Sequence, residues 1–131
     1  MTKEELVDYW VKTSDRDFKA MGNFFQIKEY SWALFVGHLV IEKLLKAYYV
    51  KNVSTVPLLS HNLVRICEKA GLRLTKEQEK NLTTITTFNI QTRYPDYKSK
   101  FFKKCTPEFT KVHIEHIKKL RSWLIEMIQK K

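Results

Sequence analysis

The chain has 131 residues, of which 44% are hydrophobic and 29% charged, a balance typical of one globular domain spanning residues 1–131. Three glycines and three prolines are too few for a turn-rich all-β protein, and they favour long helices. The formal net charge of +10 favours an anionic partner, although a solvated lysine face that aids solubility would give the same charge.

The positive charge is concentrated in the last third of the chain. Residues 91–131 contain 11 Lys and Arg against 4 Asp and Glu, a net charge of +7, whereas the first ninety residues carry only +3. A local excess of this kind indicates RNA, a nucleotide or an acidic protein surface as the partner.

Neither membrane insertion nor metal binding is predicted. The apolar run around Val40 is interrupted by charged residues, and the first ten residues lack the pattern of a signal peptide. Cys67 and Cys105 do not have the spacing of a metal site. We therefore expect a cytoplasmic protein with no membrane segment and no cofactor. Its two cysteines are expected to be reduced, and a disulfide between them is the alternative if their geometry allows it.

The first predicted helix covers residues 3–21, and Thr2 can cap its N-terminus. The charged residues 15–17 interrupt its apolar pattern, which we interpret as a solvated face with local ion pairs. Residues 22–23, Gly-Asn, predict the end of this helix. The apolar residues 24–27 are then expected to form a short loop that packs across the start of the next helix.

The longest apolar-rich run, residues 30–52, predicts a second helix that is apolar around most of its circumference. Such a helix is buried on most sides, so other helices must surround it. One narrow strip is different, because His38, Glu42 and Lys46 follow one another at intervals of four residues. The strip is either a solvated edge with a Glu42–Lys46 ion pair or a functional site, in which Glu42 binds an arginine or Lys46 contacts a phosphate.

Two further helices follow. Ser60 is the predicted N-cap of a short third helix that ends at Gly71. Thr75 opens a fourth helix, and its spacing from Gln78 is that of a capping box. The threonine-rich residues 83–87 are interpreted as helical and not as a strand, because the apolar residues around them keep a spacing of three to four.

The fourth helix is expected to end before Pro95, and residues 93–107 are interpreted as an irregular basic and aromatic segment. Pro107 begins the last predicted helix, which extends to about Gln129. Together these elements predict an all-α fold, an up-and-down bundle of four to five helices with short connections.

Two groups of histidines are candidate sites. His61 is predicted in the first turn of the third helix, where it could attract an anion or simply cap the helix. His113 and His116 lie three residues apart on the last helix, but no third ligand accompanies them, so no metal site is predicted.

The most unusual local feature is the run of Arg93, Tyr94 and Tyr97 around Pro95. Arginine offers a planar set of donors for phosphate or carboxylate, and the tyrosines offer surfaces on which bases can stack. This combination predicts binding of a nucleotide or single-stranded RNA. The alternative is a helix-ending turn whose tyrosines pack on the bundle and whose arginine pairs with an acid such as Glu42.

Four pieces of the chain, in order, together resemble the HEPN domains of prokaryotes and higher eukaryotes. They are Trp10 with Asp15 and Asp17, then Trp32-Ala33-x-Phe35 leading into Ile41-Glu42-Lys43-x-x-Lys46-Ala47, then Ser60-His61-Asn62-Leu63, and Arg93-Tyr94-Pro95. The resemblance covers nearly the whole chain. It implies an up-and-down helical bundle that forms a homodimer.

Two functions occur in the family that the chain resembles. Many members are metal-independent ribonucleases, often toxins, in which an arginine is followed four to six residues later by a histidine. Arg93 matches the arginine, but residues 97–100 contain no histidine, and the next one is His113. Members of another branch accompany a minimal nucleotidyltransferase, and are thought to bind nucleotide or substrate or to be modified on a tyrosine.

The resemblance and the residues together predict a nucleotide- or RNA-binding partner of a minimal nucleotidyltransferase, in a toxin–antitoxin-like module. The predicted ligand-binding residues are Arg93, Tyr94, Tyr97, Glu42, Lys46 and His61. One alternative is a ribonuclease in which Arg93 is catalytic and His61 or a lysine replaces the missing histidine. The other is a helical scaffold without a ligand. Under the first prediction, Glu42 should lie within ion-pair reach of Arg93 or face the same cleft.

Overall fold

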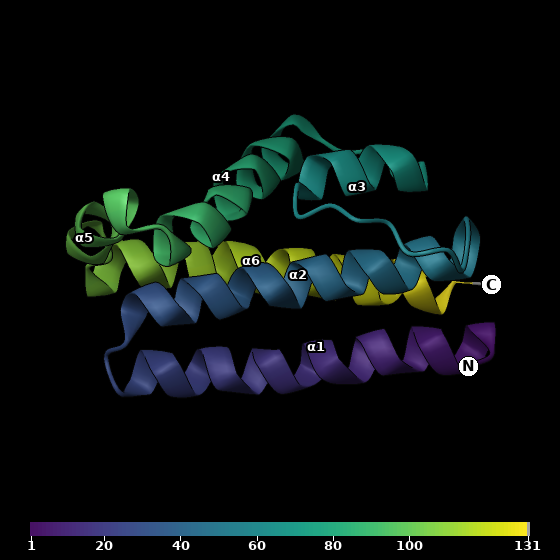
Figure 1. Cartoon of the computed structure of the whole chain (residues 1–131), viewed down its shortest axis with the longest axis horizontal. Coiled ribbons are helices and arrows are strands. Elements are labelled where there is room, and N and C mark those ends of the chain that lie inside the picture. The colour runs from purple at the N-terminus through teal and green to yellow at the C-terminus, as the bar shows by residue number, and fades with distance from the viewer. Residues whose placement is uncertain (131) are drawn as a thin grey trace.

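The computed structural model describes residues 1–130, which form six helices and no strand (Figure 1). The helices are α1 (Lys3–Gln26), α2 (Tyr30–Asn52), α3 (Leu63–Ala70), α4 (Lys76–Arg93), α5 (Pro95–Lys104) and α6 (Pro107–Gln129). The predicted all-α class is confirmed. The predicted number of four to five helices is too low by one to two, and the sequence pattern does not indicate α5.

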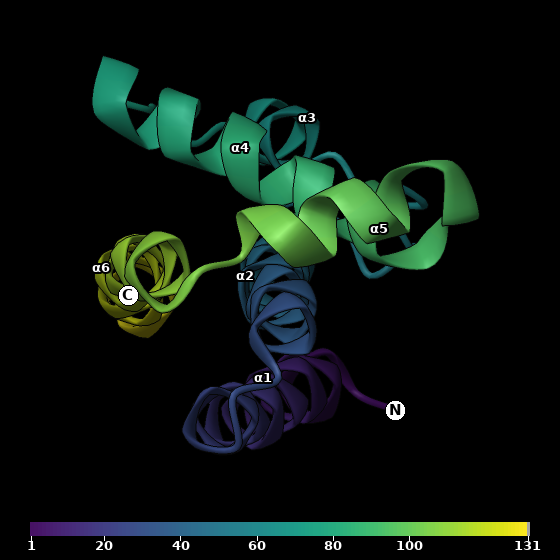
Figure 2. The ribbon, with the colours of Figure 1, turned by 90° about the vertical axis from the view of Figure 1, so that its left-hand side faces the viewer.

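The four long helices alternate in direction along the bundle, and α3 and α5 are short insertions on either side of α4 (Figure 1). The two termini consequently lie at the same end of the molecule. In the view along the bundle, α2 occupies the centre, with α1, α6 and the α3–α4 pair around it (Figure 2). The surrounding helices that the apolar circumference of α2 predicts are therefore present.

The core is built around α2. Eleven of its 23 residues are buried, and nine of these are apolar or small. Full burial of a large aliphatic side chain contributes about 1.5–3 kcal/mol, so this helix supplies a large share of the hydrophobic stabilisation. At Gly37, side chains of α1 and α6 come close to the backbone of α2. A Cβ atom there would lie 2.5 Å from Cδ1 of Ile117 on α6 and 3.1 Å from Sδ of Met21 on α1.

The helix ends follow local chemistry closely. Thr2 and Glu5 form a capping box at the start of α1, and Thr75 and Gln78 form another at the start of α4, as predicted for the latter. Gly71 ends α3 in the left-handed conformation, with φ of 74°. These short-range signals can be recognised in the sequence because each involves residues only three or four positions apart.

The predicted end of α1 at residues 22–23 is wrong. The helix continues through Gly22 to Gln26, and Phe24 and Phe25 belong to its last turn and not to a loop. The ring of Phe25 packs against that of Tyr30 at the start of α2, with centroids 5.4 Å apart. This packing offsets the cost of about 1 kcal/mol for a glycine inside a helix.

The N-cap of α3 is Asn62 and not Ser60. The Asn62 side-chain oxygen accepts a hydrogen bond from the backbone N–H of Arg65 at 3.2 Å. The Ser60 hydroxyl accepts one from the Asn62 backbone N–H, also at 3.2 Å, and so shapes the turn before the helix. His61 therefore precedes α3, and the prediction that it lies in the first helical turn is also wrong.

Residues 95–104 form α5, where the sequence predicts an irregular segment. Pro95 occupies the first helical turn, and the helix ends with two lysines near its negative pole. Only Phe101 of this helix is buried, and its ring lies 5.5 Å from that of Phe88 on α4. A single buried residue gives no apolar periodicity, which explains why the sequence pattern does not reveal the helix.

The charged residues 15–17 connect α1 to other helices and do not merely pair locally. Asp15 accepts a hydrogen bond from Arg121 on α6 at 3.3 Å, and the Asp17 carboxylate lies 2.6 Å from Nζ of Lys43 on α2. The Arg121 guanidinium also lies 3.9 Å from the centroid of the Phe18 ring. The interpretation as a locally paired solvated face is therefore wrong.

Both cysteines are free and buried. Burial raises the pKa of Cys67 to about 12 and that of Cys105 to about 11, so neither thiol is a nucleophile at neutral pH. Within residues 1–130, no helix is long and apolar enough to cross a bilayer. The same residues contain no cluster of three or more side chains suited to metal coordination.

Candidate functional site

The predicted site residues fall into two separate groups. Glu42, Lys46 and His61 meet on one side of α2, together with His38, and we call these four residues the Glu42 cluster. The other group is Arg93, Tyr94 and Tyr97 at the junction of α4 and α5. Within residues 1–130, no hydrogen bond or ion pair joins the first group to the second.

The Glu42 cluster is centred on a buried carboxylate, since only 5% of the Glu42 side chain is exposed. One oxygen, Oε1, accepts a hydrogen bond from Nδ1 of His61 at 2.8 Å. The other oxygen, Oε2, accepts one from Nζ of Lys46 at 3.0 Å. The strip on α2 is therefore not a solvated edge, because its acid is buried between two donors from different parts of the chain.

Burial alone would raise the pKa of Glu42, but the hydrogen bonds from His61 and Lys46 outweigh it, so the pKa lies below its usual value. Glu42 is therefore ionised at neutral pH. His38 is fully buried, and this desolvation lowers its pKa and keeps the ring neutral. Its Nε2 lies 3.1 Å from the backbone oxygen of His61, and donates to it.

This arrangement fixes the tautomer of His61. An ionised carboxylate only accepts hydrogen bonds, so Nδ1 of His61 carries a proton and Nε2 is left free. The His61 side chain is 63% exposed, so Nε2 can reach solvent or a bound molecule. A histidine held in this way by a carboxylate can accept or donate a proton.

The α4–α5 junction presents an exposed basic and aromatic surface. Arg93 donates through Nη1 to the side-chain oxygen of Asn89 at 3.2 Å, which leaves its other donors available. Tyr94 is 53% exposed and Tyr97 is 52% exposed, so the alternative in which the tyrosines pack on the bundle is wrong. These residues have the properties needed to contact phosphates and bases.

The predicted ion pair between Glu42 and Arg93 is wrong. Within residues 1–130 the Glu42 carboxylate is paired with lysine and histidine side chains, and Arg93 is bonded to Asn89. The buried acid of α2 therefore has its own partner, His61, which the sequence does not reveal. The other part of the prediction, that the two side chains face the same cleft, stays a prediction.

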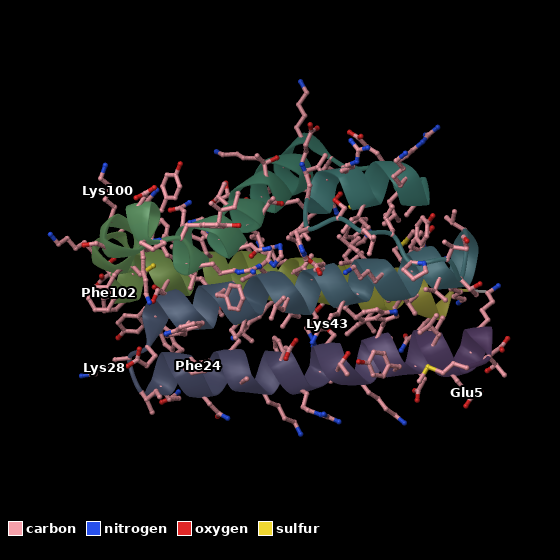
Figure 3. The ribbon with its side chains drawn as sticks, in the orientation of Figure 1. Glu5, Phe24, Lys28, Lys43, Lys100 and Phe102 are labelled. Atoms are coloured by element: carbon pink, nitrogen blue, oxygen red, sulfur yellow. The ribbon has the colours of Figure 1, made fainter. Side chains whose placement is uncertain are left out.

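A cavity of about 510 Å³ lies beside the α4–α5 junction, between α5 and the start of α2, and we call it the α2–α5 cavity. It is lined by Glu29, Ser31, Trp32, Thr92, Pro95, Lys98, Ser99, Phe101 and Phe102. The α5 residues other than Phe101 are spaced as one helical face. Figure 3 shows Phe102 at the end of the bundle where α1 turns into α2.

The sequence prediction missed this cavity. Trp32 is interpreted from the sequence as part of the apolar run of α2, yet it is 41% exposed. The 3–4 spacing of Lys98, Ser99 and Phe102 would have indicated a shared face if residues 95–104 had been recognised as a helix. The helix-start signal, a proline followed by an acid, was present at Pro95.

The comparisons with known proteins agree with this fold. The family model of the HEPN domain matches residues 7–128. The chain belongs to the HEPN domain family. This HEPN domain is also similar to the crystal structure of TT1696 from Thermus thermophilus, with a TM-score of 0.80 at 14% identity, covering 92% of this chain and 97% of that one. At that identity the likeness shows a common fold. A search of the curated proteins finds no matching sequence.

Proposed function

We propose that this HEPN domain binds nucleotide or RNA at the α4–α5 junction, as the partner of a minimal nucleotidyltransferase. The observation that carries the proposal is the exposure of two tyrosines beside Arg93 on the most basic part of the chain. Four lysines of α5 extend this positive surface. A surface with both charge and stacking groups suits a nucleic acid better than a protein carboxylate.

The partnership with a nucleotidyltransferase rests on the family resemblance and on the position of the tyrosines. Tyr94 lies between α4 and α5 and Tyr97 in the first turn of α5, so both phenol groups are accessible to a partner enzyme. The domain would act as a homodimer. The partner is tested by co-expressing the neighbouring reading frame and isolating the complex: a small nucleotidyltransferase that co-purifies and labels a tyrosine supports the proposal.

Binding is tested with a fluorescently labelled single-stranded RNA and with ATP. Arg93→Ala should weaken RNA binding about tenfold or more, since a charged hydrogen bond to phosphate contributes about 1.5–3 kcal/mol. The affinity should also fall steeply with salt. Lys69→Ala, on α3 and away from the junction, is the control. Equal affinities for wild type and Arg93→Ala would refute the site.

A ribonuclease is the second candidate, and one observation favours it. His61 is oriented by the buried Glu42 and has a free Nε2, as a general base requires. In this case RNA would be cleaved without metal, and His61→Ala and Arg93→Ala would each abolish cleavage. Stable RNA after prolonged incubation with the wild-type protein would eliminate this candidate and leave the binding function.

A further inference from the structure

The α2–α5 cavity has two aromatic walls from different helices. Trp32 comes from the first turn of α2 and is 41% exposed, and Phe102 comes from α5 and is 68% exposed. The Trp32 ring is held edge-on by Phe35, with centroids 5.7 Å apart, so its orientation is fixed by packing. Large aromatic side chains are normally buried, and two exposed ones in one hollow mark a binding surface.

The polar groups of the cavity have opposite charges and are not paired with each other. Glu29 precedes α2 and makes no side-chain capping bond, and Lys98 projects from α5. Among the ion pairs within residues 1–130, none includes Glu29 or Lys98. Thr92 also lines the cavity, and its hydroxyl has no hydrogen-bond partner in the described part of the chain.

These features define the ligand. The aromatic walls suit a flat ring, Lys98 suits a phosphate, and the Glu29 carboxylate suits a ring that presents N–H donors at its edge. A volume of about 510 Å³ is in the range of small-molecule sites and is large enough for one nucleotide. A uracil base presents one N–H at its pairing edge, whereas guanine presents an adjacent N–H and amino group that can both donate to one carboxylate.

We infer that the α2–α5 cavity binds one guanine nucleotide, with the base between Trp32 and Phe102, its donor edge at Glu29 and its phosphate at Lys98. The inference rests on the proposed function and specifies the base that the domain selects. The nucleotide can be free or part of a single-stranded RNA that continues along the positive surface of α5. Both sources share the same base and phosphate.

The inference is tested by titrating the protein with GMP and UMP and with two RNA octamers, one containing a central guanine and one made of uridine. GMP should bind at least tenfold more tightly than UMP. Trp32→Ala and Phe102→Ala should each weaken GMP binding about tenfold or more, because stacking contributes about 1–3 kcal/mol per base. Lys98→Ala should weaken GMP binding, and Glu29→Gln should remove most of the preference over UMP.

Two variants serve as matched controls. Tyr9→Ala removes an exposed aromatic ring on α1, and Lys69→Ala removes a lysine of α3 that does not line the cavity. Neither should change GMP binding by more than about twofold. Circular dichroism of every variant checks that the helices are intact. Fluorescence of Trp32, compared with a Trp32→Phe variant, reports occupancy of the cavity directly.

The outcomes separate this inference from the proposed function. An octamer that binds far more tightly than GMP identifies RNA as the source, and equal affinities identify a free nucleotide; both support the site. RNA binding that depends on Arg93 but not on Trp32 or Phe102 overturns the inference and leaves the proposed function intact. Absence of any nucleotide or RNA binding overturns both.

Discussion

Replacing Glu42 with glutamine should lower the free energy of unfolding by about 2–3 kcal/mol. The substitution keeps the shape of the side chain but removes the charge that pairs with Lys46 and His61 at 3.0 and 2.8 Å. Removing one member of a buried ion pair costs about 3–5 kcal/mol. The lysine and histidine side chains are 18% and 63% exposed, so water can partly solvate them, which places the effect below that range.

The loss is measured by urea unfolding followed by circular dichroism, and by thermal melting. For a chain of 131 residues, about 2.5 kcal/mol corresponds to a decrease in Tm of about 9 °C. The control is Glu115→Gln, whose pair with Lys118 is 3.5 Å long and about half exposed, and which should change stability by less than about 0.5 kcal/mol. A change of similar size in both variants would refute the reasoning.

Four other tests concern the packing and the buried groups. The two buried cysteines should react with a thiol reagent at pH 8 only as fast as the protein opens, and rapid labelling of the native protein would contradict their burial. Gly22→Ala should raise the free energy of unfolding by up to about 1 kcal/mol, because nothing lies within 4 Å of the added methyl group. Gly37→Ala should lower it by about 1 kcal/mol through the clash with Ile117, and equal effects of the two alanines on the urea midpoint would argue against that close approach. The free energy of unfolding should decrease as the pH falls below about 6.5, because His38 has a lowered pKa in the folded protein and binds a proton more readily when unfolded. It should decrease further below about 4.5, because the pKa of Glu42 is also lowered in the folded protein. A urea midpoint that stays constant from pH 7 to 4 would exclude both contributions.

The parts of the fold that the sequence predicted are those specified by neighbouring residues. The apolar circumference of α2 and the capping pair of Thr75 and Gln78 act over one or two helical turns, so their patterns can be recognised directly. The HEPN fold followed from motifs spread along the chain. Helix α5 was missed because its single buried side chain, Phe101, provides no period.

The candidate site could be predicted only in part, because its contacts depend on irregular segments. His61 reaches Glu42 through residues 53–62, a connection without secondary structure whose course no periodicity defines. The same limit applies to the α2–α5 cavity, where the side chain of Trp32 faces a helix that begins more than sixty positions later. The residue types indicated which side chains can bind a ligand, whereas the tertiary structure determines which of these side chains lie next to one another.

The two partners of Glu42 should form at different stages of folding. Lys46 lies one turn away on the same helix, so its contact can exist as soon as α2 forms beside α1. His61 is 19 residues away, so its contact also requires the connection to α3 to close back over α2. A substitution at His61 should therefore accelerate unfolding while leaving the folding rate almost unchanged. The contact between the buried carboxylate and His61 would then contribute little to the folding nucleus, and would mainly slow the unfolding of the folded chain.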